Sequence, residues 1–430
     1  MTTFQKYQTK RYDCFKRAKE LRAEYLSDLL NAKQRGKKVL MVNAETMFGL
    51  WSGFPDLQMY WPTGRIQDIL ATEPGLTTEY LEQAEARGYR EICAWIMAPF
   101  GEMLSPRGKV KPDIMVTHHV CEPMCKAEQV IADVMGIPGF AFEMPRLPQG
   151  QLRDFHFKYF LAQLHDAIEW MEKTTGTKCD DEALCLGVQN ERETLVLLAK
   201  VLDLNRAIPA PLDFKLCASL TWPAWVEARR SRTVEYMRTL YDETKYRVEH
   251  KIAAVANERK RLFHEAAPPF PAMSLLQVGH KYGAVFIGGS TLMIYPPAYK
   301  VAEDGSLIVG PTVQEEGLKL KTRDDALRAL AATHLYYSPV GPWMSLLPRE
   351  QITLKAAKDW HIDGIVFHMD RGCQGMPAGM TEVQLACKQA GLATMIYEAN
   401  SVDSRGFAES QILDSFESFF GTLGLTKLED

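Results

Sequence analysis

The chain has 430 residues, of which 46% are hydrophobic and 24% charged, and a net charge of -4, as in ordinary globular proteins. A chain of this length buries a large core and is expected to fold into two or more domains. No basic surplus is available to neutralise phosphates, which argues against nucleic acid or an anionic membrane as a partner. No run approaches the ~18 apolar residues of a membrane span, and the polar N-terminus lacks the apolar core of a signal peptide. We therefore expect a cytoplasmic protein without a membrane segment.

The first third of the chain is predicted to alternate between helix and strand. Residues 1–36 have the apolar spacing of one charged amphipathic helix, and KVLMVNAE (38–45) is expected to be the first strand. The remaining elements are expected to be helices around 64–72 and 78–88, a short strand REICAWIM containing Cys93, the strand PDIMVTHH, a helix over 122–135 and the strand GFAFE. Buried strands that alternate with helices through short connections predict a parallel sheet covered on both faces.

The middle of the chain, from about 151 to 270, is predicted to be helical. Its long segments have helical periodicity and charged runs typical of solvated faces, and APPFPA (267–272) ends it. Residues 274–430 return to alternating helices and strands, including AVFIGG, GIVFHM and ATMIYE. The predicted fold class is α/β, with two Rossmann-like lobes containing parallel sheets and joined by a helical segment. The expected domains are an N-terminal lobe with its leading helix (1–150), a helical connector (151–272) and a C-terminal lobe (273–430).

One unit occurs twice: a hydrophobic strand, a cysteine where a helix is expected to begin, and a second strand that ends in glutamate. The first copy places Cys121 before Glu143, and the second places Cys373 before Glu398. In open α/β sheets, ligands bind beyond the carboxyl ends of the strands. A thiol at a helix N-terminus is expected to have a lowered pKa, and thiolates are soft ligands that suit zinc or iron–sulfur clusters.

Nine cysteines are too scattered to match a contiguous ferredoxin or zinc-finger motif, so the fold would have to assemble any metal site. Cys121, Cys373 and Cys93 are the candidates, with structural or redox-active thiols as the alternative. Cys125 lies one helical turn after Cys121 and could replace it. Five other cysteines are expected to be plain buried or half-buried thiols: Cys14, Cys179, Cys185, Cys217 and Cys387.

Other polar residues near the strand ends are expected to be structural. His118, His119 and His368 could bind zinc or donate protons, but hydrogen-bonded structural roles are favoured. Glu143 and Glu398 are expected to support neighbouring groups or cap helices. No phosphate-binding G-x-x-x-x-G-K-[ST] loop, dinucleotide-binding G-x-G-x-x-G or nucleophile elbow G-x-S-x-G is present, so the sequence supports neither ATP hydrolysis nor dinucleotide binding by this chain.

Three segments resemble the benzoyl-CoA reductase and 2-hydroxyacyl-CoA dehydratase family. The most specific is HMDRGCQGMPAGMTEVQLACKQAGLATMIYEANSVDSRGF, with an R-G-C-x-G core and a later E-x-N-x-x-D-x-R. PDIMVTHHVCEPMCKAEQVIADVMGIPGFAFEMPR is similar to the family's second cysteine region, and CAWIMAPFGEML to its first. The layout is similar over essentially the whole chain.

The resemblance implies a heterodimer of two homologous α/β subunits, each of which binds one 4Fe–4S cluster through three cysteines. The implied ligands here are Cys93, Cys121 and Cys373; Cys121 is chosen over Cys125 because C-E-P-x-x-K fits the family's spacing. The resemblance also implies an ATP-hydrolysing activator with its own 4Fe–4S cluster, ferredoxin as the upstream electron donor and an acyl-CoA substrate.

Within the family, the length and the R-G-C-Q-G context are most similar to the larger cluster-binding subunit of ATP-dependent benzoyl-CoA reductase, which reduces an aromatic acyl-CoA to a cyclic diene. Dehydratase subunits often have an acidic residue close before the glycine of the first strand–loop region. Here the acidic residue, Glu45, lies further from the glycine, and aromatic or apolar residues lie nearer Gly53. This pattern predicts a pocket suited to an aryl thioester. The alternatives are a 2-hydroxyacyl-CoA dehydratase subunit and a non-catalytic scaffold or activator-docking subunit. The catalytic proton donor is not identified.

Overall fold

The longer strands form two four-stranded sheets, in each of which all neighbouring strands are parallel. The computed structural model describes residues 6–42, 47–90, 92–145, 151–295 and 297–429. The first sheet has the order β3-β2-β4-β5 and the second the order β12-β11-β7-β8. Their strands are β2 Lys38–Val42, β3 Leu57–Tyr60, β4 Ile114–His118, β5 Gly139–Phe142, β7 Lys260–Glu265, β8 Ala284–Gly288, β11 Gly364–Asp370 and β12 Ala393–Ala399. The predicted α/β class with parallel sheets is confirmed.

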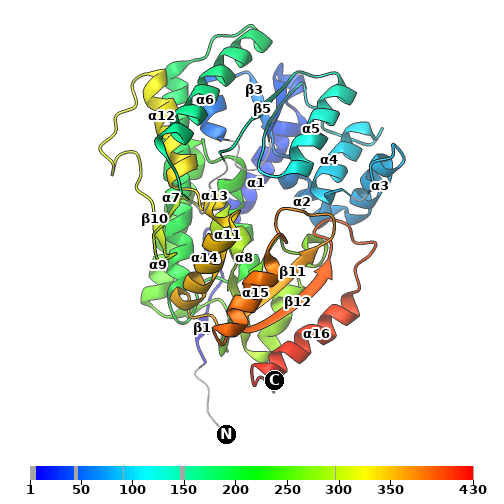
Figure 1. The fold of residues 1–430 in the computed structure, drawn as a ribbon, viewed down its shortest axis with the longest axis vertical. Coiled ribbons are helices and arrows are strands. Elements are labelled where there is room, and N and C mark those ends of the chain that lie inside the picture. Colours follow the sequence, from blue (N-terminus) through cyan, green and yellow to red (C-terminus); the bar gives the residue numbers. More distant parts are fainter. Residues whose placement is uncertain (1–5, 43–46, 91, 146–150, 296, 430) are drawn as a thin grey trace.

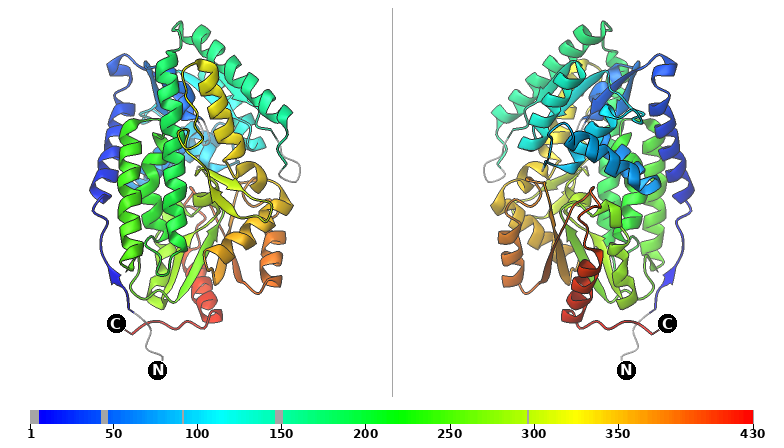
Figure 2. Two further views of the ribbon diagram at one scale, coloured as in Figure 1. Left: turned by 90° about the vertical axis from the view of Figure 1, so that its left-hand side faces the viewer. Right: turned by 90° about the vertical axis from the view of Figure 1, so that its right-hand side faces the viewer.

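Helices surround both sheets. The helices of the first part of the chain are α1 Phe15–Leu30, α2 Pro62–Thr72, α3 Pro74–Glu85, α4 Ala94–Leu104 and α5 Glu122–Met135. The middle part contributes α6 Asp154–Thr175, α7 Asp181–Asp203, α8 Phe214–Val226 and α9 Ser231–Glu249. The last part contributes α10 Leu275–Val278, α11 Ser290–Ile294, α12 Arg323–Tyr336, α13 Val340–Trp343, α14 Leu346–Asp359, α15 Met380–Gln389 and α16 Glu409–Thr422. The long helices α7 and α9 run side by side along one side of the molecule (Figure 2).

Two pairs of very short strands lie outside the main sheets. β1 Gln8–Thr9 pairs with β6 Ile252–Ala253 in parallel, and β9 Tyr299–Val301 pairs with β10 Leu307–Val309 in antiparallel fashion. The first of these pairs joins the N-terminal segment to the chain just after α9. Among the described residues, no helix has both the length and the apolar character needed to cross a membrane.

The inner strands of the first sheet, β2 and β4, are buried on both faces apart from Lys38, as their apolar residues predict. Leu40 and Val42 of β2 point into one core, while Val39 and Met41 point into the core on the opposite face. This alternation is the period of two that a strand requires. Both cores are closed by helices, so the strand ends, and not the sheet faces, are left for binding.

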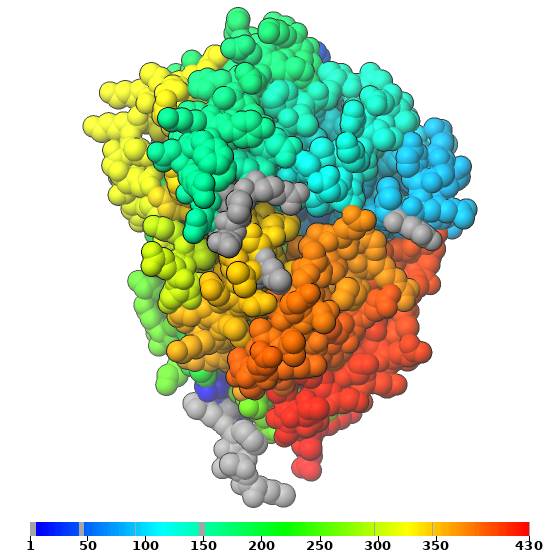
Figure 3. Space-filling model, in the orientation of Figure 1, coloured from blue at the N-terminus to red at the C-terminus, as the bar shows by residue number. Residues whose placement is uncertain are grey.

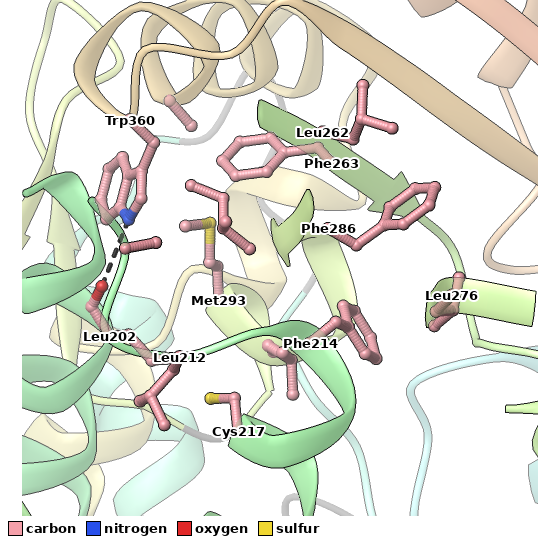
Figure 4. Close-up of a cluster of buried hydrophobic side chains, with 14 of the residues drawn as sticks. Leu202, Leu212, Phe214, Cys217, Leu262, Phe263, Leu276, Phe286, Met293 and Trp360 are labelled. Carbon is pink, nitrogen blue, oxygen red and sulfur yellow. Dashed lines mark hydrogen bonds between the residues drawn. The ribbon is translucent and has the colours of Figure 1, made fainter. Parts of the chain in front are cut away.

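The core of the second sheet includes the helical segment that precedes it. Phe263 and Phe286 from neighbouring strands pack with Phe214 and Cys217 of α8 (Figure 4). The indole Nε1 of Trp360, directly after α14, donates a hydrogen bond of 3.2 Å to the carbonyl of Leu202 (Figure 4). The middle helices are therefore packed against the second sheet, and Cys217 is a core thiol, as predicted.

The prediction of helix over residues 260–265 is wrong, because KRLFHE forms β7 in the interior of the second sheet. The charges of this segment suggested a solvated face. Arg261 is instead buried, and its guanidinium donates to Glu258 at 2.6 Å and to the carbonyl of Trp360 at 2.9 Å. A buried arginine is tolerated when its donors are paired in this way.

Other boundaries also differ from the predictions. The second half of the segment expected to be a strand around Cys93 is the start of α4, which is buried almost all round; residue 91 of that segment lies outside the described part. A short apolar run does not distinguish a buried helix from a strand by its periodicity. The first helix covers only Phe15–Leu30 of the expected 1–36, and β2 ends at Val42; residues 43–45 of the expected first strand lie outside the described part. The division into three domains stays a prediction, although α12 packs against α6 and α7 of the middle segment.

Candidate functional site

Three cysteines from distant parts of the chain line one cavity. Cys93 is the N-cap residue of α4, Cys121 is the N-cap residue of α5, and Cys373 follows the end of β11. The cavity has a volume of about 200 Å³. The structure thus brings together the three cysteines that the sequence singled out, while their role as ligands stays a prediction. Cys125 does not line this cavity.

The cavity lies between the two parallel sheets with their surrounding helices, which we call the first and second lobes. The loops after β11 and β12 extend from the second sheet toward α2–α5 of the first lobe (Figure 1). In the space-filling view, the C-terminal lobe lies directly below the part of the N-terminal lobe formed by α3–α5 (Figure 3). A parallel sheet presents the carboxyl ends of its strands at one edge, which is where ligands bind in such folds.

Two glycines of the R-G-C-Q-G motif allow the thiols to approach one another. Gly372 has a φ of +82°, and a Cβ built on it would lie 3.0 Å from the carbonyl oxygen of Ile92, the residue before Cys93. A Cβ on Gly375 would lie 3.5 Å from the Cβ of Cys121. The loop that carries Cys373 therefore packs against both of the other cysteine segments, and Gly372 adopts a left-handed conformation that other residues rarely accept.

The E-x-N-x-x-D-x-R motif holds this loop in place. The side-chain amide of Asn400 donates to the carbonyl of Arg371 at 3.0 Å, and its oxygen accepts from the backbone N–H groups of Val402 and Asp403. Asp370 accepts hydrogen bonds from the backbone and the hydroxyl of Ser401. The motif is thus a support for the Cys373 loop and does not line the cavity.

The end of the same motif joins the two lobes. Arg405 forms an ion pair with Asp403 beside it and another with Glu85 at the end of α3. Glu398 pairs with Arg371 at the surface, so its predicted supporting role agrees with its position. These contacts connect β12 of the second lobe with the first lobe close to the cysteines.

Arg349 of α14 supports the other end of the cysteine loop. Its guanidinium donates to the carbonyls of Met376 and Ala378, and it lies 4.7 Å from the ring centre of Trp343. The side chain is 3% exposed, so these bonds are made away from water, where they are strong. Nothing in the sequence around Arg349 indicated this role, because the contact joins two segments that local pattern does not relate.

The duplicated unit is only partly symmetrical in the structure. Cys121 caps α5 as predicted, whereas α15 begins at Met380, after a loop that follows Cys373. The expected lowering of thiol pKa by a helix N-terminus is also wrong for two of the three residues. Burial raises the pKa of Cys93 well above its ordinary value, and Cys373 beside it adds to the effect. Burial likewise raises the pKa of Cys373, against an opposite contribution from the backbone N–H of Met376.

These thiols need a cation to become thiolates at neutral pH, since a bound metal inverts the effect of burial. Among the described residues, no group of three His, Cys, Asp or Glu side chains is arranged to hold a metal ion. A cluster differs from a single ion because it fills the space between its ligands. Three soft donors around one apolar cavity are a donor set compatible with a cluster of this kind.

The cavity wall is aromatic and uncharged. Trp61 stacks on Trp225 with ring centres 6.1 Å apart, and Trp95 meets Phe270 edge-on at 5.0 Å. Among the described lining residues there is no Lys, Arg, Asp or Glu. The polar side chains that line the cavity are uncharged and include Thr63 and Gln67 of α2 and Thr291 of α11.

The sequence located the aromatic wall in the wrong segment. Phe48, Leu50 and Trp51, which precede Gly53, are core residues of the first lobe and do not line the cavity. Glu45 lies outside the described residues. The lining tryptophans come instead from α4, from α8 and from the N-cap position of α2, and only the three-dimensional packing reveals that they share a wall.

The histidines near the strand ends do not line the cavity. His119 lies 3.0 Å from Glu122 and 2.8 Å from Glu143, so Glu143 has a supporting role, as predicted. His368 bonds to the carbonyl of Ala267 at 2.6 Å and stacks on Tyr397. His118 is fully buried. These positions agree with the favoured structural roles.

Comparison with known proteins gives a family and three distant relatives. The family model described as "2-hydroxyglutaryl-CoA dehydratase, D-component" matches residues 68–423. The alpha subunit of (R)-2-hydroxyglutaryl-CoA dehydratase from Acidaminococcus fermentans is 25% identical over 70% of this chain, and the match spans only 58% of that relative. The (R)-phenyllactyl-CoA dehydratase alpha subunit of Clostridium sporogenes is 21% identical, covering 89% of this chain and 88% of the relative.

A benzoyl-CoA reductase subunit of Thauera aromatica is 22% identical, and the match covers 94% of this chain and 92% of the relative. The family model extends over most of the chain and includes the loops of all three cysteines. The resemblance found in the sequence is confirmed: the chain belongs to the 2-hydroxyglutaryl-CoA dehydratase D-component family, and one of its distant relatives is named as a benzoyl-CoA reductase subunit.

Proposed function

We propose that this chain is the cluster-binding subunit of an ATP-dependent benzoyl-CoA reductase, with one 4Fe–4S cluster held by Cys93, Cys121 and Cys373. The single observation that carries the proposal is that these three thiols line one uncharged, aromatic cavity where the lobes meet. Three protein ligands would leave one iron of a four-iron cluster without a cysteine ligand. When bound, such a cluster supplies electron transfer at low potential.

The protein's own residues would orient the acyl group and exclude water. Trp61, Trp95 and Trp225 offer flat apolar surfaces on which an aromatic ring can stack. The lack of a charged side chain among the described lining residues disfavours an acyl group that ends in a carboxylate, because that charge would be buried unpaired. Gln67 and Thr63 could donate to the thioester carbonyl. A dry cavity prevents water from competing for a reactive intermediate.

A second candidate is a 2-hydroxyacyl-CoA dehydratase subunit that acts on an aromatic acyl group. The family model and two of the relatives favour it, and one of these relatives is named for phenyllactyl-CoA, whose ring would suit the same aromatic wall. In both cases the expected partners are a homologous second cluster-binding subunit, an ATP-hydrolysing activator with its own 4Fe–4S cluster, and ferredoxin as the upstream donor. The proposed compartment is the cytoplasm.

The ligand set is tested by iron and sulfide content after anaerobic purification. We expect about four irons and four acid-labile sulfides per chain. Cys121→Ser should lose the cluster, whereas Cys125→Ser, one helical turn away and outside the cavity, should keep it. A colourless wild-type protein with stoichiometric zinc would refute the cluster. Loss of the cluster in Cys125→Ser but not in Cys121→Ser would show that Cys125, and not Cys121, is the ligand.

The reaction is tested by assay of the reconstituted complex with benzoyl-CoA and with phenyllactyl-CoA. ATP-dependent formation of a cyclic diene from benzoyl-CoA supports the reductase, and loss of water from phenyllactyl-CoA supports the dehydratase. A third possibility, a non-catalytic scaffold or activator-docking subunit, predicts that Cys373→Ser leaves turnover intact.

A further inference from the structure

A second pocket, separate from the cysteine cavity, is strongly basic. It has a volume of about 510 Å³ and lies between α7, the start of α9, and the short 3-10 helix η2 Phe48–Gly53. Its cationic lining residues are Lys37, Arg229, Arg230 and Arg232, and its acidic one is Asp28. It shares no lining residue with the cavity of the three cysteines. Its size is in the range of sites for small molecules.

Arg229 is the unusual member of this group. The residue is 9% exposed, and within the described part of the chain its guanidinium has neither a hydrogen bond nor an ion pair. Burial and the neighbouring Arg230 lower the pKa of Arg229 to about 9. A buried cation without an anion is unfavourable unless a ligand supplies one.

The carboxylates near Arg229 already have other partners. Glu227 binds Arg232 through two guanidinium nitrogens, at 2.7 and 3.1 Å. Glu191 accepts from the backbone N–H groups of Phe48 and Gly49 at 3.0 and 2.8 Å. The acid on the pocket wall, Asp28, lies within ion-pair distance of Arg35 and of Arg232. The protein thus leaves the charge of Arg229 uncompensated by a direct contact.

The backbone adds to the attraction for an anion. Arg230 is the N-cap residue of α9, whose 19 residues give a full helix dipole with its positive end at this pocket. Ser231 lines the pocket beside it and accepts a hydrogen bond of 3.1 Å from Asn190. A helix N-terminus next to arginines is the arrangement that proteins use for phosphate groups.

We propose that this pocket binds a phosphate monoester, with Arg229 and Arg230 as the main cationic contacts. The phosphate group could belong to a free metabolite or to coenzyme A. Coenzyme A is a geometrically reasonable source. Trp225 lines the cysteine cavity, and Arg229 follows it by four residues, which span no more than about 14 Å of chain. The proposal does not rest on the proposed function, because orthophosphate alone tests it.

The test is calorimetric titration of the full-length protein with orthophosphate, AMP, coenzyme A and dephospho-coenzyme A. We expect saturable binding of orthophosphate and AMP, and at least about tenfold weaker binding by Arg229→Gln, since a charge-assisted hydrogen bond is lost. The matched control is Arg238→Gln in α9, where the arginine is exposed and paired with Glu193; it should bind like the wild type. Unliganded Arg229→Gln should be at least as resistant to heat as the wild type, because a buried unpaired charge is removed.

The titrations with coenzyme A and dephospho-coenzyme A identify the source of the phosphate group. Tighter binding of coenzyme A than of dephospho-coenzyme A, with the difference lost in Arg229→Gln, assigns the pocket to the 3′-phosphate of the coenzyme. Equal binding of coenzyme A and dephospho-coenzyme A, beside saturable binding of AMP, assigns it to free phosphate compounds. Should Arg229→Gln fail to fold, Arg230→Gln carries the same expectation of weaker binding. Absence of saturable binding to any of the four probes, or binding unchanged in the arginine variants, would overturn the proposal.

Discussion

The approach of Cys373 to the other two thiols depends on a position without a side chain. Gly372 combines a left-handed backbone with a contact to the carbonyl of Ile92, so any Cβ there meets two penalties at once. The residue is part of the R-G-C-Q-G motif, and its geometry gives a physical reason for a glycine directly before the cysteine. A substitution here should affect the site more than the fold.

We therefore expect Gly372→Ala to lower the free energy of unfolding by about 1–2 kcal/mol from backbone strain, plus a contact penalty, and to reduce the iron retained after anaerobic reconstitution. Gly391→Ala is the control, because Gly391 has a φ of +84° and open space around its Cβ position. It should lose stability in urea but keep its iron. Equal iron contents in the two variants would show that the Gly372 contact does not position Cys373.

Glu265, the last residue of β7, is the clearest source of pH dependence. It is fully buried, and desolvation raises its pKa to about 7 from 4.5, although Arg349 and Ser290 act in the opposite direction. The folded state therefore holds a proton that the unfolded state has released, and stability is lost as the pH rises from 4.5 through about 7.

Replacement of Glu265 by glutamine should remove this loss. At pH 8 the variant should be more stable than the wild type by on the order of 3 kcal/mol at most, and near pH 4 the two should be similar. Arg349 keeps its bonds to the carbonyls of Met376 and Ala378 but loses the attraction of the Glu265 carboxylate, which offsets part of the gain at pH 8. Urea unfolding at several pH values measures the effect, and parallel pH profiles for the two proteins would contradict it.

At the scale of elements, the sequence predicted the helices and strands that a local pattern specifies. β4 and β11 contain short apolar runs before cysteines, and α5 covers Glu122–Met135, directly after Cys121, as predicted. β7 was missed because Arg261 is paired through tertiary contacts, and α4 because its burial hides the helical period. The cysteines were identifiable one by one, but their shared cavity and its tryptophan wall depend on packing between segments far apart in sequence.

Asn400, in the segment after β12, holds two stretches of backbone in place at once. Asn400→Ala should destabilise the chain by about 1–2 kcal/mol through the loss of these bonds and release the Cys373 loop. Asn400→Asp keeps the acceptor for Val402 and Asp403 but loses the donor to Arg371. We expect it to preserve the turn and still to lose iron. Full iron retention in Asn400→Asp would show that the tether to Arg371 is dispensable.

At the scale of the whole molecule, the cysteine cavity joins two sheets that otherwise have separate cores. Cys93 and Cys121 belong to the lobe of the first sheet and Cys373 to that of the second. Direct links between the lobes near the site include the ion pair of Arg405 with Glu85. A group bound to all three thiols would add a further link, and binding to the native state alone stabilises that state.

Anaerobic reconstitution with iron and sulfide should therefore raise the unfolding temperature of both lobes together. Cys93→Ser and Cys373→Ser should both abolish the rise, although they lie in different lobes, because a cluster with only two protein ligands should not be retained. Cys125→Ser should keep it, since this thiol lies on α5 outside the cavity. Anaerobic scanning calorimetry measures the shift. A rise that survives in Cys373→Ser but not in Cys93→Ser would place the bound iron in the first lobe alone and contradict a site shared between lobes.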